Sequence, residues 1–228
     1  MRNATRAFNV MQERLRCFVD DRTMMLAAIS HDLRTMLTRL KLRAEFIDDA
    51  EQQAKAISDL DEMQAMLDST LAFARDDAAE EPRTQTDLAA LVQSLCDDMA
   101  DAGQPVSCET DGRLAYVCAP GAIKRAVQNI VVNAIKYGVS ASVEVSEEAD
   151  RIDIAVTDRG PGIPVDRRED VFRPFFRLET SRNRETGGSG LGLAVARSIA
   201  RRHGGDIVLE DAGDGGLTVR LSLPHTPM

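Results

Sequence analysis

A long amphipathic helix is the feature that most constrains what this chain can fold into. Near-continuous helix is expected from about residue 7 to about residue 48, because neither Gly nor Pro interrupts that stretch. Its apolar residues recur in steps of four or three, the spacing of a single helical stripe, and they are Ile29, Leu33, Leu37, Leu40, Ala44 and Ile47. A stripe this long needs a packing partner, since it would otherwise remain exposed to water.

A second helix supplies part of that cover. After a polar break at residues 48–51, the sequence predicts a helix over residues 51–75. Its apolar face consists of Ile57, Leu60, Met63, Leu67, Leu71 and Ala74. Two such helices form a hairpin, but one hairpin alone buries little. We therefore expect a homodimer in which residues 23–75 of two copies form a four-helix bundle.

His31 points away from the apolar stripe. It lies two residues from both Ile29 and Leu33, so at 100° per residue it faces water. Asp32 is its neighbour and Thr35 lies one turn further along the same face. An imidazole beside a carboxylate is a usable nucleophile, because the carboxylate can hold one ring nitrogen protonated and leave the other free. Taken alone, such a pair is more often a solvated surface feature.

Composition narrows the possible partners. The 228-residue chain is 43% hydrophobic and 29% charged, and its formal net charge is -9. This charge argues against a nucleic-acid partner held by phosphate contacts. The four cysteines lack CxxC spacing and three histidines cannot complete a plausible metal set, so we expect reduced thiols in a cytosolic protein. No apolar run approaches the ~20 residues of a membrane span, and we expect a soluble chain that could still be the inner part of a membrane receptor.

The pattern changes in the second part of the chain. Residues 76–86 are acidic and contain Pro82, which predicts an interdomain linker. Beyond it, the expected helices and strands predict a mixed sheet covered on one face by helices, an α/β sandwich. The expected helices span residues 87–102, 121–137 and 191–203, and the expected strands span residues 106–109, 114–118, 142–146, 152–157, 206–210 and 217–223.

Two asparagines form the first candidate ligand-binding motif. Asn129 and Asn133 lie one turn apart on the expected helix, and Lys136 and Tyr137 continue their face. An amide oxygen is a neutral hard ligand for Mg²⁺, an ammonium group neutralises phosphate, and a phenol ring can stack on a base. Without further support, a solvated helix face is the better interpretation of these four residues.

Glycines mark the second and third motifs. Asp158, Gly160 and Gly162 follow an expected strand, where the carboxylate could accept a hydrogen bond from an exocyclic amine such as that of adenine, or simply belong to a tight turn. Residues 187–193 open an expected helix with a glycine-rich backbone, the geometry of a phosphate site. This stretch matches neither a P-loop nor a dinucleotide fingerprint. Between the two motifs, the aromatic residues of 172–177 could anchor a mobile lid or form a small core cluster.

In this order, the motifs resemble the cytoplasmic half of a sensor histidine kinase of the EnvZ-like class. The stretch around His31 is similar to the H-box of that family, and the later motifs are similar to its N-box, G1 box, F-box and G2 box. Residues 1–22 resemble the tail of a HAMP signalling linker. The resemblance implies an α+β fold: a dimerising two-helix hairpin over residues 23–80, the histidine phosphotransfer domain, followed by a GHKL-type α/β sandwich ATP-binding domain over residues 81–228. It also implies the cytoplasmic part of a bacterial inner-membrane receptor.

The resemblance implies phosphoryl transfer as the activity. His31 would be autophosphorylated with ATP, and the phosphoryl group would pass to an aspartate on the receiver domain of a response regulator. Asp32 would orient the imidazole. Thr35 would help to place a water that dephosphorylates the same regulator, which would make the protein a phosphatase as well. Such chemistry depends mainly on positioning and charge neutralisation.

The resemblance also assigns the nucleotide contacts. Asn133 would ligate Mg²⁺ with Asn129 nearby, Lys136 would meet phosphate, Tyr137 would meet the base or sugar, and Asp158 would read the adenine amine. Arg177 and a lid over residues 178–188 would close over the nucleotide, and residues 189–193 would cradle its phosphates. The implied nucleotide-binding residues are Asn129, Asn133, Lys136, Tyr137, Asp158, Gly160, Gly162, Phe172, Arg177, Leu178, Gly188, Ser189, Gly190, Leu191, Gly192 and Leu193.

One position departs from the family pattern. Proline usually follows the residue that corresponds to Thr35, but this chain has Met36. Proline inside a helix removes a hydrogen bond and introduces a kink, at a cost of ~3 kcal/mol. Met36 restores the donor toward the Asp32 carbonyl. Our hypothesis is a straighter and stiffer helix around His31, with a shifted balance between kinase and phosphatase activity.

Two alternatives remain open at this stage. One is a GHKL ATPase similar to the gyrase, Hsp90 and MutL group, although those proteins lack a hairpin like that of residues 23–75. The other is a weakened signalling scaffold in which Met36 spoils the helix geometry. ATP turnover without phosphorylated His31 would favour the first, and nucleotide binding without turnover would favour the second.

Overall fold

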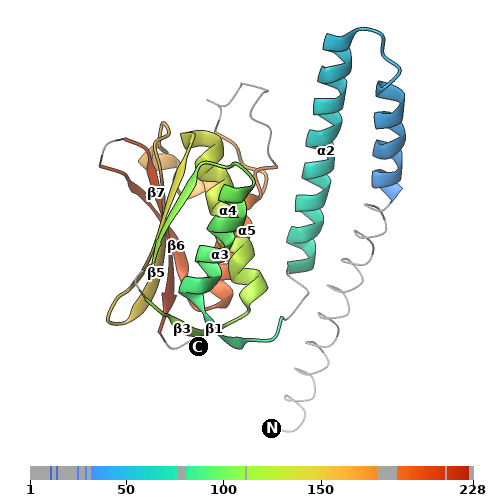
Figure 1. The fold of residues 1–228 in the computed structure, drawn as a ribbon. Helices are drawn as coiled ribbons and strands as arrows, with labels where there is room; N and C mark the ends of the chain where they lie inside the picture. Colours follow the sequence, from blue (N-terminus) through green and yellow to red (C-terminus); the bar gives the residue numbers. More distant parts are fainter. Residues whose placement is uncertain are drawn as a thin grey trace. The chain divides into compact units, whose positions relative to one another are not determined.

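In a computed structural model, the chain forms two units. They are residues 1–80 with residues 187–189, called here the helical unit, and residues 81–186 with residues 190–228, called the α/β unit (Figure 1). Each is described by itself. The described residues are 11, 14, 25, 29, 32–76, 81–110, 112–178, 189–213 and 215–225. His31, most of the predicted HAMP tail and nearly all of the predicted lid, including Gly188, therefore lie outside the described residues.

The helical unit is a hairpin. Residues 32–44 are helical without a break at Met36, and the chain then turns into α2, Ala50–Asp76. Asp49 caps α2, because its Oδ1 accepts hydrogen bonds from the backbone N–H groups of Glu51 and Gln52 at 2.9 and 3.0 Å. The second helix is confirmed. The first ends at residue 44 rather than near 48, where tighter backbone bonds such as Ile47 N–H to the Ala44 carbonyl close the last turn.

The hairpin buries only part of its apolar stripe. Leu37, Ala44 and Leu60 form its buried centre, and Lys41 and Asp61 form an ion pair across the two helices. Leu33 and Leu40, which belong to the same predicted stripe, are 41% and 45% exposed. One hairpin therefore leaves an apolar seam uncovered.

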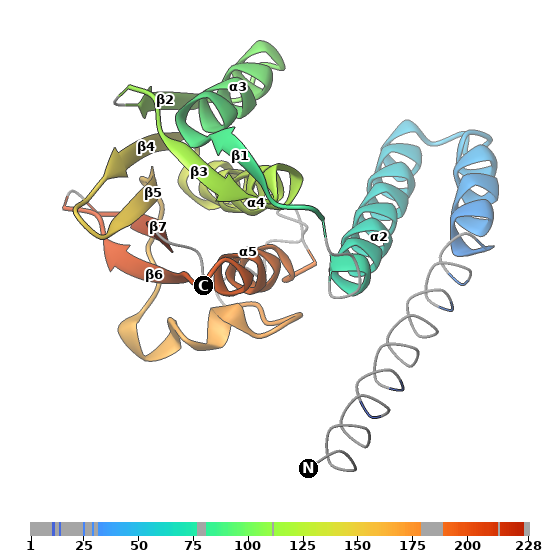
Figure 2. The ribbon, with the colours of Figure 1, turned by 90° about the horizontal axis from the view of Figure 1, so that it is seen from below.

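The α/β unit is built on a five-stranded sheet in the order β2-β4-β5-β7-β6 (Figures 1 and 2). The first pair is parallel and the others are antiparallel. The strands are β2 (Val106–Thr110), β4 (Ala141–Glu147), β5 (Arg151–Asp158), β7 (Leu217–Pro224) and β6 (Asp206–Asp211). All five strands were expected from the sequence, β4 and β5 from their alternating apolar residues.

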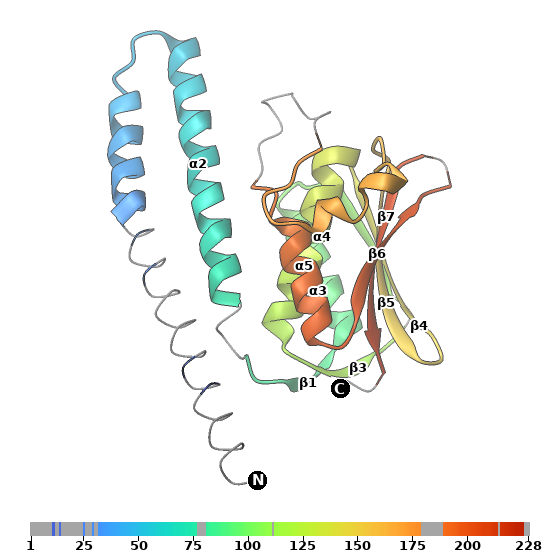
Figure 3. The same cartoon turned by 180° about the vertical axis from the view of Figure 1, so that it is seen from behind.

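Three helices lie together on one side of this sheet (Figure 3). They are α3 (Leu88–Asp101), α4 (Pro120–Gly138) and α5 (Gly192–Arg202), and the Asp87 side chain caps α3. Ile130 of α4, Ile154 of β5 and Ile199 of α5 are fully buried between the layers. The α+β class and the α/β sandwich are therefore confirmed. Two short 3₁₀ helices, η1 (Val165–Arg167) and η2 (Asp170–Phe172), lie in the long connection from β5 to α5.

The linker predicted over residues 76–86 is wrong from Glu81 onward. Residues 84–87 form β1 (Thr84–Asp87), which pairs with β3 (Ala115–Cys118) in a separate two-stranded sheet. Both Glu81 carboxylate oxygens accept backbone N–H groups at the start of α4, from Gly121 and Ala122, at 2.9 Å. The acidic composition suggested a solvated segment, but here a carboxylate caps a helix N-terminus, where negative charge is favourable. In the described part of the chain, no helix has the length and apolar character of a membrane span.

Candidate nucleotide-binding site

The asparagine motif and the third glycine motif lie side by side. A Cβ atom added to Gly192, the first residue of α5, would lie 3.3 Å from Asn133 Nδ2 and 3.8 Å from Asn129 Cβ. Both asparagines are partly exposed on α4. A larger residue at position 192 would press on them, so the glycine allows α5 to begin beside the two amides. Within the described residues, Leu191 at the start of α5 makes no side-chain cap hydrogen bond, and the free N–H groups of a first helical turn are suited to an anion.

Backbone N–H groups hold Asp158 at the end of β5. The residue is 6% exposed, and Oδ1 accepts the N–H groups of Gly160 at 2.7 Å and Leu217 at 3.3 Å. Among the described residues, no hydrogen bond to its Oδ2 is found. A Cβ atom at Gly138 would lie 2.4 Å from Asp158 Cβ, and one at Gly216 would lie 2.0 Å from the Asp158 carbonyl oxygen. Glycines thus admit a fixed, nearly buried carboxylate with one oxygen open to a donor.

The end of α4 packs against this carboxylate turn. A Cβ atom at Gly160 would lie 2.6 Å from the Tyr137 carbonyl oxygen. The Tyr137 ring is 43% exposed, and the Lys136 ammonium lies 5.2 Å from its centroid. Val139 ends α4 with φ 68, and its N–H donates to the Ile135 carbonyl at 3.0 Å. The Tyr137 end of the asparagine motif therefore lies against the Asp158 turn, at the C-terminal end of α4.

The aromatic stretch packs on the third glycine motif. Gly190 has φ 68, and a Cβ atom there would lie 2.8 Å from the Phe176 carbonyl oxygen. The Phe175 N–H donates to the Gly190 carbonyl at 3.0 Å. Leu191 is fully buried and anchors the start of α5 in the core. The positive φ explains why a glycine is needed at position 190.

The predicted site residues that the structure describes fall into three groups, and His31 and Gly188 lie outside the described residues. The α/β unit brings together residues of α4, of the Asp158 turn and of the start of α5: Asn129, Asn133, Lys136, Tyr137, Asp158, Gly160, Gly162, Gly190, Leu191, Gly192 and Leu193. Phe172, Arg177 and Leu178 lie in the connection from β5 to α5, and Ser189 belongs to the helical unit. Asp32 and Thr35 are exposed on the first helix.

Sequence reasoning missed two kinds of residue. Gly216 and Leu217 hold Asp158, yet neither was among the predicted site residues. The signal was present, because three glycines exceed what a turn between two strands requires. Arg197 and Asp206, which join α5 to β6, carried no recognisable pattern, because an Arg in a helix and an Asp in a strand are ordinary surface residues.

Family models match two successive parts of the chain. Residues 21–79 match the His Kinase A (phospho-acceptor) domain, and residues 118–227 match the histidine kinase-, DNA gyrase B-, and HSP90-like ATPase family. The site and the mixed sheet thus define the α/β unit as a GHKL-type ATP-binding domain. The first match argues against a stand-alone GHKL ATPase.

Similar proteins extend both matches. The chain is 39% identical over 222 residues to the sensor histidine kinase GtrS of Pseudomonas aeruginosa, covering 96% of this chain and 46% of that protein. It is 31% identical over 229 residues to the sensor histidine kinase CpxA of Escherichia coli, covering 96% and 50%. The solved histidine kinase domain of the E. coli osmosensor EnvZ is 33% identical, with 66% of this chain and 93% of that one covered and a TM-score of 0.51. The chain spans about half the length of GtrS and CpxA. It belongs to the sensor histidine kinases of two-component systems.

Proposed function

We propose that this chain uses ATP to phosphorylate His31 and then passes the phosphoryl group to an aspartate of a response-regulator receiver domain. The observation that carries the proposal is the convergence of three motifs in one unit. The asparagines of α4 adjoin the start of α5, and the end of α4 adjoins Asp158. The match of residues 21–79 to a phospho-acceptor domain supplies the receiving group.

The adenine end of the nucleotide is assigned to Asp158. Its Oδ1 is occupied by two backbone donors, so Oδ2 is the oxygen that would accept the exocyclic amine. Tyr137 is exposed nearby on α4 and would cover the base or sugar. Gly160 and Gly162 would let the backbone approach the ring closely.

The phosphate end is assigned to the start of α5. Residues 189–193 would surround the phosphates with backbone N–H groups, and the positive end of the helix dipole would favour their charge. Lys136 would neutralise phosphate, and Arg177 and residues 178–188 would close over the nucleotide.

Mg²⁺ is assigned to Asn133, with Asn129 nearby. Mg²⁺ usually keeps several waters and takes one or two protein ligands besides the substrate phosphates. A single amide oxygen beside the phosphate-binding helix start meets that requirement. The metal would neutralise charge on the transferred group.

In the transfer step, an unprotonated imidazole nitrogen of His31 attacks the γ-phosphorus of ATP. A nitrogen–phosphorus bond forms, the bond to the β,γ-bridging oxygen breaks, and ADP leaves with that electron pair. Asp32 would keep the other ring nitrogen protonated and correctly oriented. Thr35 is exposed one turn away and would position water in the reverse task, dephosphorylation of the regulator.

Assembly is a further part of the proposal. We assign dimerisation to residues 23–75, because Leu33 and Leu40 remain exposed on one hairpin. Residues 1–22 would be the tail of a HAMP linker, and residues 81–228 the catalytic domain. Because the similar sensor kinases are about twice as long, we propose that the chain is the cytoplasmic part of an inner-membrane receptor.

The test is phosphate incorporation from γ-labelled ATP with Mg²⁺, in this chain and in His31→Gln. Label that is acid-labile, base-stable and lost in the variant supports the kinase and its nucleophile. Asp158→Asn should lose label through lost nucleotide binding, whereas His31→Gln should still bind nucleotide. Bound nucleotide without label in the unmodified chain would refute the kinase and favour the scaffold alternative.

A further inference from the structure

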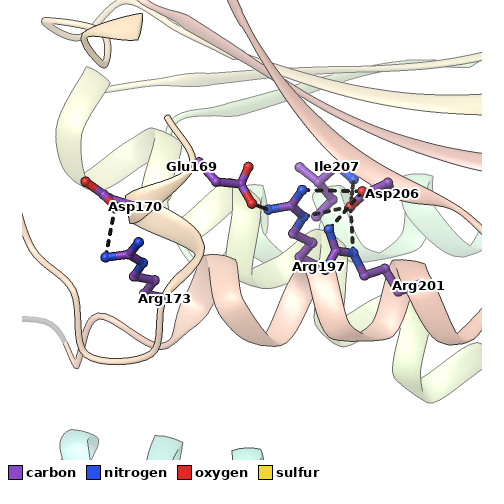
Figure 4. A network of polar contacts seen from close by, with 7 residues as sticks. All are labelled: Glu169, Asp170, Arg173, Arg197, Arg201, Asp206 and Ile207. Atoms are coloured by element: carbon purple, nitrogen blue, oxygen red, sulfur yellow. Dashed lines mark hydrogen bonds and ion pairs between the residues drawn. The ribbon is translucent and has the colours of Figure 1, made fainter. Parts of the chain in front are cut away.

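Arg197 joins three separate elements of the α/β unit (Figure 4). It lies on α5, and its Nη1 donates to Glu169 Oε1 at 2.6 Å. Its Nε donates to Asp206 Oδ1 at 2.8 Å and its Nη2 to Asp206 Oδ2 at 3.4 Å. The guanidinium carbon also lies 4.2 Å from the centroid of the Phe172 ring. One side chain thus ties α5 to β6 and to the η2 region.

This network is more than a solvated surface pair. The Arg197 side chain is 14% exposed, so its charge is largely removed from water and interacts strongly with its partners. Burial would by itself raise the pKa of Asp206, but hydrogen bonds from Arg197 and Arg201 lower it to about 2. The carboxylate is therefore charged throughout the physiological range and holds Arg197 in one position.

The segment that Arg197 holds leads directly to the glycine motif. Glu169 and Phe172 precede Phe175, whose N–H donates to the Gly190 carbonyl at 3.0 Å. A Cβ atom at residue 190 would lie only 2.8 Å from the Phe176 carbonyl oxygen. The backbone shape of Gly190 is therefore set by a segment whose other end is fixed by Arg197, which lies five residues after Gly192, the first residue of α5.

We propose that Arg197 is a positioning residue for nucleotide binding. It holds residues 169–176 against α5, so that the backbone N–H groups of residues 190–192 are ordered before a nucleotide arrives. The proposal rests on the proposed function of this site as an ATP site. The ligand contacts belong to the glycine backbone, and Arg197 acts only through the segment that it holds.

The role requires arginine rather than a positive charge alone. A guanidinium presents two edges and a flat face, and here the two edges meet Asp206 and Glu169 while the face meets the Phe172 ring. A lysine ammonium has its three donors on one nitrogen and no flat face, so it cannot reproduce all of these contacts. Arg197→Lys should therefore recover only part of what Arg197→Met loses.

Arg201 offers a matched control on the same helix. Its Nη2 donates to Asp206 Oδ2 at 3.1 Å, and it is 57% exposed. Within the described residues, it has no contact with Glu169 or Phe172. Arg201→Met removes a positive charge from the same carboxylate but leaves the segment attached to α5.

The experiment compares the unmodified chain, Arg197→Met and Arg201→Met in two measurements. The first is hydrogen exchange of the amides at residues 173–176 and 190–192 without ligand, and the second is the Kd of a non-hydrolysable ATP analogue. If the ordered arrangement falls from nearly all molecules to about one tenth, the Kd rises about tenfold. We expect this rise, together with faster exchange, in Arg197→Met and neither change in Arg201→Met. Glu169→Gln, at an exposed position, should show a smaller change in the same direction without a risk of unfolding.

Equal effects of the Arg197 and Arg201 variants would overturn the proposal, because Asp206 would then be the cause. Unchanged exchange and Kd in Arg197→Met would also overturn it. If the unmodified chain itself failed to bind the analogue, the proposed function would fall, and the ligand-free exchange comparison would still decide whether Arg197 holds the segment.

Discussion

The helical unit and the α/β unit bury their apolar residues to very different degrees. Among the described residues of the hairpin, Leu37, Ala44 and Leu60 form a small buried centre, while Leu33 and Leu40 remain exposed. In the α/β unit, the sheet and its three helices enclose a continuous core with many fully buried side chains. Apolar burial is the main favourable term in folding.

This difference in apolar burial indicates which unit can fold stably without a packing partner. The α/β unit satisfies its own packing and can hold a nucleotide site rigidly. The hairpin is incomplete by itself, so its stability depends on what covers its seam and on protein concentration. A signalling protein can use that dependence, since a change in helix association then acts on the hairpin without disturbing the nucleotide site.

The strongest test of this contrast replaces Leu33 and Leu40 together with Asp. Each carboxylate would be buried without a partner in a bundle, at a cost of several kcal/mol, so we expect a monomer with reduced helix content. Sedimentation equilibrium measures the association, and circular dichroism measures the helix. Leu42→Asp is the control, because Leu42 is 53% exposed and lies on the opposite face. A persistent dimer in the double variant would contradict the predicted seam.

A cavity in the α/β core should destabilise the α/β unit and leave the dimer intact. Ile130 is fully buried, and Ile130→Ala should reduce the free energy of unfolding of this unit by about 2–5 kcal/mol. Scanning calorimetry should show a lower transition for the α/β unit, with the dimer retained. Val132→Ala, at a 43% exposed position of the same helix, should leave the transition nearly unchanged. Loss of the dimer in Ile130→Ala would mean that the two units are not energetically separate.

Met36→Pro changes the geometry of the first hairpin helix but keeps Leu33 and Leu40, the exposed apolar residues of the seam. Proline would remove a helix hydrogen bond and kink the helix, which costs about 3 kcal/mol in a helix interior. We expect the ratio of kinase to phosphatase activity to change while nucleotide affinity stays the same. Paired assays of autophosphorylation and of regulator dephosphorylation measure the ratio, with Met36→Leu as the control. An unchanged ratio would defeat the hypothesis about Met36.

The stability of the α/β unit should fall in mild acid because of His203. Burial lowers the pKa of this His below its ordinary 6.5, while its hydrogen bond to the Ile199 carbonyl opposes the shift. Nδ1 donates to that carbonyl at 2.8 Å, and Nε2 accepts the Ala119 N–H at 3.2 Å. Below about pH 6.5 the unfolded chain binds a proton that the folded chain resists, so the free energy of unfolding decreases as pH falls.

Urea unfolding at a series of pH values measures this loss. His203→Leu is less stable at neutral pH, because it leaves the Ala119 N–H unpaired at a cost of about 1–3 kcal/mol, but its stability should vary less between about pH 7.5 and 5.5. The same slope in both proteins would show that another group titrates.

The smallest expected effect concerns Glu81. Glu81→Ala leaves the Gly121 and Ala122 N–H groups without their cap, which should cost about 1 kcal/mol in the α/β unit. Thermal unfolding of this variant is compared with that of Glu148→Ala, an exposed glutamate of the turn between β4 and β5. If both variants melt alike, the cap contributes nothing to stability.

Most of the fold could be predicted from the sequence, because most of its helices and strands have a local sequence pattern. Ile152, Ile154 and Val156 alternate along β5, and Asp87 and Gly103 mark the two ends of α3. β1 was missed because its four residues, Thr-Gln-Thr-Asp, are polar and its partner β3 is distant in the chain. Pairings between distant segments leave no periodic pattern in either of them.

The candidate site divides in the same way. Asn133, Asp158 and Gly192 were predicted because glycine and amide motifs are local, but their proximity depends on the packing of α4 against α5 and β5. Gly216 and Arg197 could not be predicted, because their importance lies in contacts with residues far along the chain. The dimer and the role of His31 remain predictions.

The place of β7 in the chain has a consequence for synthesis. Gly216 and Leu217 hold Asp158, and β7 pairs with β5 across about sixty residues, as in Thr157 with Thr218. A growing chain therefore carries every nucleotide motif before it carries the strand that brings Asp158 into place. Because domains generally fold as units, a chain still lacking β7 should not bind ATP. Nucleotide would then stabilise finished chains only, and truncated products would remain inactive and open to proteolysis.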